Sequence, residues 1–226
     1  MATMTKRKKA AAEAVDMAKI HTVEQAVELI EKFPKTKFDE TVEIHLDLNI
    51  DPKNADQAVR GTVVLPHGTG KKVKIAAFCK GENFQKARDL QVTHVGAEDL
   101  IEKVANGFLD FDKVIATPDM MRDLSKLGKI LGPRGLMPSP KAGTVTNDIE
   151  KVVKELRAGR IEYRSDKQGD IHAGVGKRSF STEQLRENVR FFIDAILHAK
   201  PSVVKGTFIK SATLSTTMGP GLKLTI

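Results

Sequence analysis

The stretch GTFIKSATLSTTMGPGLKLTI, residues 206–226, sets the pattern around which we read the rest of the chain. From Phe208 to Thr217, β-branched and hydroxyl residues alternate with a period of two, which predicts a β-strand with Lys210 on the side of Phe208. The other side carries only Ser and Thr beyond Ile209, so we expect a flat surface there. The strand should break at Met218-Gly219-Pro220-Gly221, because Gly frees the backbone and Pro removes a hydrogen-bond donor and fixes φ.

A flat row of hydroxyls that runs into a Gly-Pro turn allows two interpretations. It suits the groove of a structured RNA, where shape and ribose 2′-hydroxyls are read more than base edges. Alternatively, the segment is an edge strand whose Thr residues simply favour β structure. Both interpretations stand at this point.

The composition favours a polyanionic partner. The chain has 226 residues, enough for one large or two small domains, with a formal net charge of +8 and a pI near 9.5. Aromatic residues make up only 5%, which argues against modules that stack bases on exposed aromatic side chains. RNA recognition would therefore depend on phosphates, riboses and shape.

The sequence also excludes several classes of protein. No apolar run has the length of a membrane span, and the first residues lack the apolar core of a signal peptide. We therefore expect no membrane partner. The single cysteine, Cys79, excludes an internal disulfide and fits a reducing cytoplasm. Since it lies in the apolar run KIAAFC, we expect a buried structural thiol.

The N-terminal and C-terminal segments both predict helices together with antiparallel strands. Residues 41–50, TVEIHLDLNI, alternate cleanly between apolar and polar residues, as a strand with one wet face does. Capping boxes begin at Thr22 and at Ser181, and each precedes an apolar stripe of helical period. Residues 160–164 and 171–175 flank the turn-rich segment SDKQGD, which predicts a hairpin.

The first twenty residues hold a basic cluster, KRKK at 6–9, followed by an Ala-rich helix-like stretch. The cluster is interpreted as a solvated end of the chain with at most weak phosphate contacts.

The middle of the chain has a different pattern. VKIAAF (73–78) and KVIAT (113–117) are continuous apolar runs, typical of strands that are buried on both faces. A short run at 93–96 and helix-like stretches surround them; these stretches are 83–90, 97–105, 119–130 and 147–158. Such alternation indicates a parallel sheet covered by helices.

Together these patterns predict an α/β fold, α+β overall, with two domains. A discontinuous domain of antiparallel sheet plus helices comprises residues 1–67 and 159–226, and an inserted Rossmann-like α/β domain comprises residues 68–158. Two chain crossings at one place predict a hinge. Residues 159–226 hold 11 basic and 6 acidic residues, against 10 and 11 in 1–67 and 16 and 12 in 68–158. This excess favours a polyanion contact in the last segment.

Residues 131–145, LGPRGLMPSPKAGTV, predict an ordered but irregular loop. Its Gly and Pro residues forbid regular structure, whereas Leu131, Leu136 and Met137 supply apolar anchors. The loop presents Arg134 and Lys141. It either cradles phosphate or crosses the end of the sheet and packs on it.

The sequence gives little support for catalysis. HGTGKK (67–72) departs from the P-loop pattern, because Leu65 stands where a Gly is needed and Lys72 stands where Ser or Thr is needed. The six histidines show no metal-binding spacing, and no carboxylates are paired for acid/base work. We therefore expect no enzyme, no cofactor and no metal. The alternative is an α/β enzyme that binds a phosphorylated ligand through the loop 131–145.

Residues 131–146, LGPRGLMPSPKAGTVT, resemble the signature of the L-one family of large-subunit ribosomal proteins, bacterial type. The resemblance runs essentially end to end. It includes DQAVRGTVVLPHGTGKK (56–72), YRSDKQGDIHAGVGK (163–177) and STTMGPG (215–221). The architecture of that family, a helix-flanked antiparallel domain split by an inserted α/β domain, agrees with the pattern described above.

The resemblance implies a set of partners. These are the ribosome, the stalk region of large-subunit rRNA, deacylated tRNA at the exit site and, in bacterial members, the protein's own mRNA, whose translation is repressed. It also implies a cytoplasmic, ribosome-bound protein that is a monomer when free.

The resemblance further implies which residues contact RNA. The matching positions are Lys37, Phe38, Glu40, Arg164, Lys167, Gly169, His172, Ser211, Thr217, Met218 and Gly219. Among them, the cations would neutralise phosphates, and Ser211 and Thr217 would bond riboses or phosphates. Met218 would pack on a sugar, Gly219 would let the backbone approach, and Phe38 would brace the surface. Glu40 would accept from a 2′-hydroxyl or orient a base, and His172 is equally compatible with a structural role.

Overall fold

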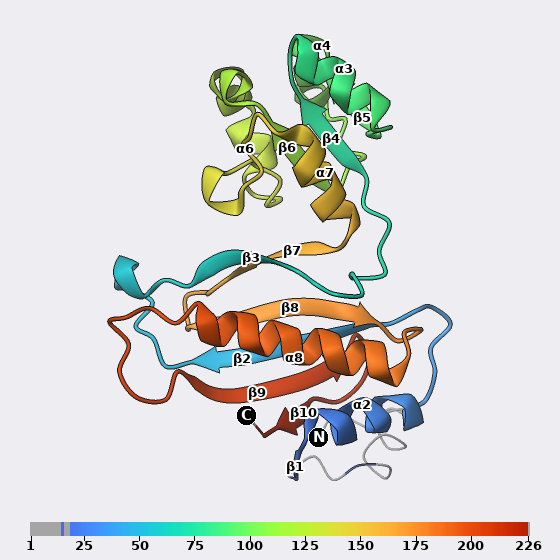
Figure 1. Ribbon diagram of the computed structural model, residues 1–226, viewed down its shortest axis with the longest axis vertical. Coiled ribbons are helices and arrows are strands. Elements are labelled where there is room, and N and C mark those ends of the chain that lie inside the picture. The colour runs from blue at the N-terminus through green and yellow to red at the C-terminus, as the bar shows by residue number, and fades with distance from the viewer. Residues whose placement is uncertain (1–14, 16–18, 226) are drawn as a thin grey trace, which may run out of the picture. The chain divides into compact units, whose positions relative to one another are not determined.

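The computed structural model describes Val15 and residues 19–225 (Figure 1). The basic cluster at 6–9 and most of the Ala-rich stretch lie outside these residues. Helices and several sheets occur together, which confirms the predicted α+β class. Contacts divide the chain into two compact units, residues 1–70 with 159–226 and residues 71–158. Within the described residues, no helix is long and apolar enough to cross a membrane.

A five-stranded sheet forms the centre of the discontinuous unit. Its order is β1 (Ile20–His21), β10 (Leu222–Leu224), β9 (Ile209–Thr216), β2 (Thr41–Leu48) and β8 (Asp170–Lys177). All neighbours are antiparallel except β1 and β10. A separate two-stranded sheet pairs β3 (Arg60–Val64) with β7 (Arg160–Arg164), and a 3-10 turn, η1 (Ala55–Gln57), precedes β3.

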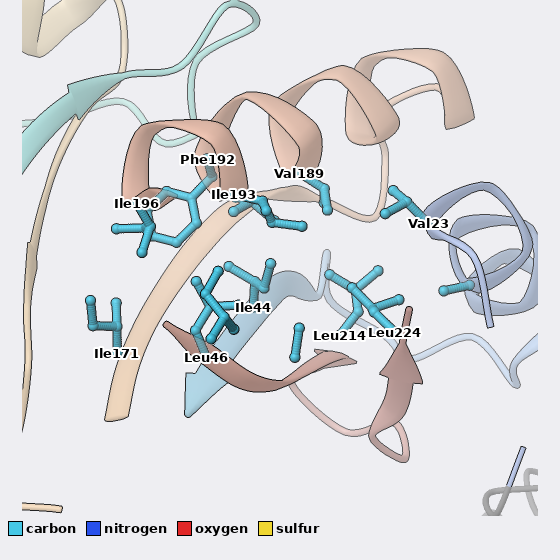
Figure 2. Close-up of a cluster of buried hydrophobic side chains, with 14 of the residues drawn as sticks. Val23, Ile44, Leu46, Ile171, Val189, Phe192, Ile193, Ile196, Leu214 and Leu224 are labelled. Carbon is cyan, nitrogen blue, oxygen red and sulfur yellow. The ribbon is translucent and has the colours of Figure 1, made fainter. Parts of the chain in front are cut away.

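Helices α2 (Val23–Lys32) and α8 (Thr182–His198) lie side by side on one face of the five-stranded sheet. Both predicted capping boxes are present, at Thr22 with Gln25 and at Ser181 with Gln184. Figure 2 shows the apolar stripe of α8 facing side chains of β2 and β9. Every second residue of β2 is fully buried, which confirms the predicted alternation. Because α2 and α8 both pack on one face of the sheet, neither helix covers the other face.

The tail strand β9 is central and not an edge strand, because it pairs with β10 on one side and β2 on the other. The edge-strand interpretation is therefore wrong. The alternation also contains one extra residue. Asp47 pairs with Ser211 but Leu48 pairs with Ile209, so Lys210 forms a bulge and is exposed, while Ile209 is buried. This corrects the expected placement of Lys210 and Ile209.

The predicted hairpin between 160–164 and 171–175 is also wrong. The intervening turn exists, since the Asp166 N–H donates to the Asp170 carbonyl over 2.9 Å. The two strands nevertheless separate after the turn, because β7 pairs with β3 whereas β8 pairs with β2. Local turn chemistry indicates that the chain reverses, but not which strand each arm selects as its partner.

The second unit contains a three-stranded parallel sheet in the order β5 (His94–Gly96), β4 (Ile75–Phe78) and β6 (Lys113–Ala116), as predicted. Its main helices are α3 (Glu82–Asp89), α4 (Glu98–Ala105) and α7 (Ile149–Arg157), the last capped by Asp148. The helix expected at 119–130 is instead broken into four short pieces, η2 (Pro118–Met120), α5 (Met121–Leu124), η3 (Ser125–Leu127) and α6 (Gly128–Leu131). Gly128 and the Ser125 hydroxyl, which donates to the Met121 carbonyl, both weaken a continuous helix.

The loop 131–145 packs against the end of β6. Leu131 is buried, a short 3-10 turn η4 (Pro140–Ala142) follows, and Val145 forms a bridge with Ala116. The loop is thus ordered and irregular, as predicted, and it presents Arg134 and Lys141 to solvent. Its packing matches the interpretation in which it crosses the end of the sheet.

Cys79 follows β4 and is fully buried, which confirms the expected structural thiol. Burial raises its pKa to about 11, because the thiolate loses its hydration.

We expect this thiol to resist alkylation in the folded protein. At pH 8 a thiol of pKa about 11 is ionised to about one part in a thousand, against about a quarter for an unfolded cysteine. The rate of reaction with a disulfide reagent at pH 8 should therefore be at least ~100-fold lower in native protein than in guanidinium. Equal rates would show that Cys79 is accessible and would contradict this placement.

Candidate nucleic-acid interface

The open face of the five-stranded sheet is the surface opposite α2 and α8. Cross-strand pairing places its side chains in rows, because residues two apart on a strand share a face. One row holds Lys223, Thr213, His45 and His172. A second row holds Ser215, Glu43 and Gly174, and a third holds Ser211, Asp47 and Asp170. Ser, Thr and Gly have short side chains or none, so the surface is flat at these positions.

The hydroxyls of the open face differ in their availability. Ser215 Oγ lies 3.1 Å from His45 Nε2 and is occupied by it. Ser211 is exposed and Thr213 is half-buried, and neither side chain bonds to another described residue. These two hydroxyls are thus available to an outside partner.

Carboxylates outnumber lysines on the open face. Glu43, Asp47 and Asp170 stand among the rows, and Lys210 at the bulge lies 3.5 Å from Asp47. Lys223 is an exposed cation within the first row, and further cations lie at the rim. Lys37, Arg164 and Lys167 are exposed and have no partner among the described residues. The rim cations would therefore contribute to the attraction of a polyanion. The short side chains at the centre of the open face would let it approach closely.

Glu40, which we expected to accept from a 2′-hydroxyl or to orient a base, is not at the surface. It is fully buried, and its Oε2 accepts from Arg178 Nη1 over 2.7 Å. Its Oε1 accepts from the Met218 N–H over 3.2 Å and from the Thr216 hydroxyl over 3.4 Å. Arg178 also donates to the carbonyls of Glu31, Phe33 and Pro34. Glu40 thus positions its neighbours, and its carboxylate is not exposed on the surface.

The turn held by Glu40 presents Thr217, Met218 and Gly219. Met218 is 56% exposed, which is unusual for a large apolar side chain in an ordered turn. The Thr217 hydroxyl accepts from the Thr41 N–H over 3.0 Å, so it is tied to the start of β2. A Cβ on Gly219 would lie 2.3 Å from the Thr216 hydroxyl oxygen, so the close turn requires glycine.

Lys37 and Phe38 belong to the same end of the sheet. Phe38 is 54% exposed, and the loop that carries it is fixed by the Thr36 hydroxyl, which donates to the Phe38 carbonyl. This loop, together with Glu31 and Arg178, lines a cavity of about 500 Å³. Glu40 connects the loop directly to Met218. The structure therefore brings Lys37, Phe38, Thr217, Met218 and Gly219 into one group.

The other predicted residues form a second group at the turn 165–170. Lys167 is exposed there, and Arg164 ends β7 just before it. Gly169 is buried with φ of 97°, and its carbonyl accepts from the Leu48 N–H, so it shapes the turn. The backbone N–H groups of Asp170 and Gln168 lower the pKa of Asp166.

The two groups lie at opposite ends of β2. Thr41 contacts the first group and Leu48 contacts the second, so eight residues of extended strand separate them by roughly 23 Å. Ser211, Thr213 and Ser215 run between them on β9. The predicted residues therefore form two rim groups, and the hydroxyl residues of β9 lie between them.

His172 lies on this surface beside His45, a residue that the sequence placed on the wet face without a role. Their Nδ1 atoms are 2.7 Å apart, so one ring donates to the other. Burial, and then the neighbouring His172, lower the pKa of His45. Arg178 was also missed, because nothing local marks it as the partner of a residue 138 positions away.

Comparison with known proteins gives a consistent result over nearly the whole chain. The pattern of the family "Ribosomal protein L1p/L10e family" matches residues 6–220. A protein of Protochlamydia amoebophila (strain UWE25), the "Large ribosomal subunit protein uL1", is 51% identical over 224 residues, 99% of this chain and 95% of that protein. Proteins of the same name from Thermosipho melanesiensis and Thermosipho africanus are 54% and 55% identical over 211 residues, covering 93% of this chain and 91% of theirs.

The buried pair predicts an unequal response to two similar substitutions. Glu40→Gln leaves the Arg178 charge buried without its anion, which we expect to cost about 3–5 kcal/mol of unfolding free energy. Glu162→Gln is the matched control, because its pair with Arg60 is about one third exposed and should contribute at most ~1 kcal/mol. Urea denaturation measures both. Similar losses for the two variants would show that the Glu40 pair is not the anchor described above.

Proposed function

The chain belongs to the ribosomal protein L1p/L10e family, and from this membership we propose that it binds the stalk region of large-subunit rRNA through the open face. As a member of this family it is a structural protein of the large ribosomal subunit and not an enzyme. The alternative of an enzyme with a phosphorylated ligand at the loop 131–145 is thereby set aside.

The chemistry of the open face supports RNA as the partner. The minor groove of an A-form helix is wide and shallow and displays 2′-hydroxyls, which both donate and accept hydrogen bonds. The free hydroxyls of Ser211 and Thr213 can do the same, and Gly174 on β8, across Glu43 from Ser215, adds no side chain to the surface. Between the charged residues of each row, these short side chains let the surface lie close to such a groove.

The rim supplies the electrostatic part of the proposal. Lys37 at one end, and Arg164 and Lys167 at the other, would neutralise phosphates on either side of the groove. Met218 and Phe38 would pack on sugars next to the first group. On this proposal, residues 1–67 and 159–226 are the RNA-binding domain, and the α/β domain, residues 68–158, is an insertion with a separate role.

We further propose the partners that the family resemblance implies. In the cytoplasm the protein would be a monomer when free and would act on the ribosome, where it would assist the movement and release of deacylated tRNA at the exit site. It would also repress translation of its own mRNA by binding a segment that mimics the rRNA site. This last role needs no second surface, because both RNAs would occupy the open face.

The first test separates the charge contribution from the hydroxyl contribution. Binding of a stalk rRNA fragment, measured across a salt series, should give a linear fall of log affinity with log salt. Lys167→Gln should weaken binding and reduce that slope by about 1, whereas Ser211→Ala should weaken binding and leave the slope unchanged. The control is Lys205→Gln, an exposed lysine in the loop after α8. If the wild-type protein shows no preference over random duplex, the proposal fails.

The second test concerns the Met218 turn. We expect Met218→Ala to weaken RNA binding more than tenfold, since a preorganised apolar contact is lost. Leu197→Ala is the matched control, because Leu197 is 43% exposed on α8, which covers the opposite face. Equal affinities for the two variants would place the RNA contact elsewhere.

Displacement of the rRNA fragment by a segment of the protein's own message tests repression. Met218→Ala should weaken both complexes alike.

A further inference from the structure

One cluster at the turn 165–170 and the start of β8 brings together three side chains of the kinds that bind metal ions. Asp166, Asp170 and His172 each offer one ligand atom, and these atoms all lie within 4.8 Å of one another. His172 Nε2 is 3.8 Å from Asp166 Oδ2. Ligands on opposite sides of one ion stand about 4.2 Å apart at metal–ligand distances near 2.1 Å, so modest side-chain rotations bring these groups to one centre.

The turn already holds one of the carboxylates in place. Asp166 Oδ1 accepts from the backbone N–H of Gln168 over 2.7 Å and of Asp170 over 2.9 Å. Its other oxygen, Oδ2, is the one that faces His172. One oxygen therefore orients the side chain and the second remains available as a ligand.

The hydrogen bonds behind His172 fix the tautomer that a metal requires. If Nε2 binds a metal, the proton of His172 must lie on Nδ1, which is 2.7 Å from Nδ1 of His45. His45 must then accept at Nδ1 and carry its own proton on Nε2, which is 3.1 Å from Ser215 Oγ. In this series of hydrogen bonds, each ring nitrogen has one role, as donor or as acceptor, that agrees with its neighbour. An outer partner that accepts from the ligating histidine is what metal sites in proteins commonly use.

We propose that Asp166, Asp170 and His172 form a binding site for a divalent transition metal, with His45 as the positioning residue behind His172. A mixed set of imidazole nitrogen and carboxylate oxygen suits Zn²⁺ or Co²⁺, whereas Mg²⁺ and Ca²⁺ prefer oxygen alone. Three protein ligands leave at least one position for water. The site would join the turn 165–170 to strand β8. This inference does not rest on the proposed RNA binding.

Titration of the full-length protein with ZnCl₂ in a non-chelating buffer tests the site, without RNA present. We expect one saturable site by calorimetry, and a Co²⁺ absorption spectrum typical of nitrogen and oxygen ligands. His172→Gln and Asp170→Asn should each weaken binding at least tenfold. The matched controls are His198→Gln and Asp194→Asn, both exposed on α8, and they should bind as the wild type does. Because no RNA is present, a failure here leaves the proposed function unaffected.

His45 variants separate a positioning role from a merely structural one. His45→Phe removes the acceptor behind His172, and we expect affinity for Zn²⁺ to fall about 10–100-fold. His45→Gln keeps an oxygen acceptor and should recover most of that loss, while ¹⁵N spectra report the His172 tautomer directly. The proposal is overturned if the wild type shows no saturable binding, if His172→Gln binds equally well, or if the α8 controls lose affinity as the site variants do.

Discussion

The pairing of β2 with both β8 and β9 is the interaction on which the discontinuous unit depends. These three strands come from two parts of the chain that are separated by residues 71–158. Once the strands pair, the intervening residues are a closed loop, and the entropic cost of closing a loop rises only slowly with its length. A whole second unit can therefore be inserted there without loss of the sheet.

The two faces of this sheet differ in their contribution to stability. Val42, Ile44, Leu46 and Leu48 bury one side of β2 against the helices, and each fully buried side chain of this size contributes about 1.5–3 kcal/mol. The opposite side contributes little to that core. It can therefore carry hydroxyls, glycine and a pair of histidines, whose identity is not dictated by packing in that core.

The buried pair of Glu40 and Arg178 shows how the rim is held. Such a pair gains little net stability, because both ions lose their hydration, but it requires one arrangement of the groups around it. Here it fixes the loop before β2, the end of β8 and the turn after β9. Met218 and Phe38 are thereby exposed in ordered positions, so binding would not have to immobilise them first.

The sequence by itself determined the local structure of this protein. Period-two alternation identified β2 and the start of the open face, the capping boxes identified α2 and α8, and continuous apolar runs identified β4 and β6. It also determined the family, because the motifs that carry the resemblance are local. These signals can be read because a helix turn or a strand pleat depends only on neighbouring residues.

Only the tertiary structure decided which strands meet and which polar groups are buried. It separated β7 from β8, made β9 central and buried Glu40. It also divided the predicted RNA contacts into two rim groups and placed Asp166, Asp170 and His172 together. Strand register and the burial of an ion pair depend on partners more than a hundred residues away. No local pattern specifies such partners, because the free energy that selects them arises only when the sheet has formed.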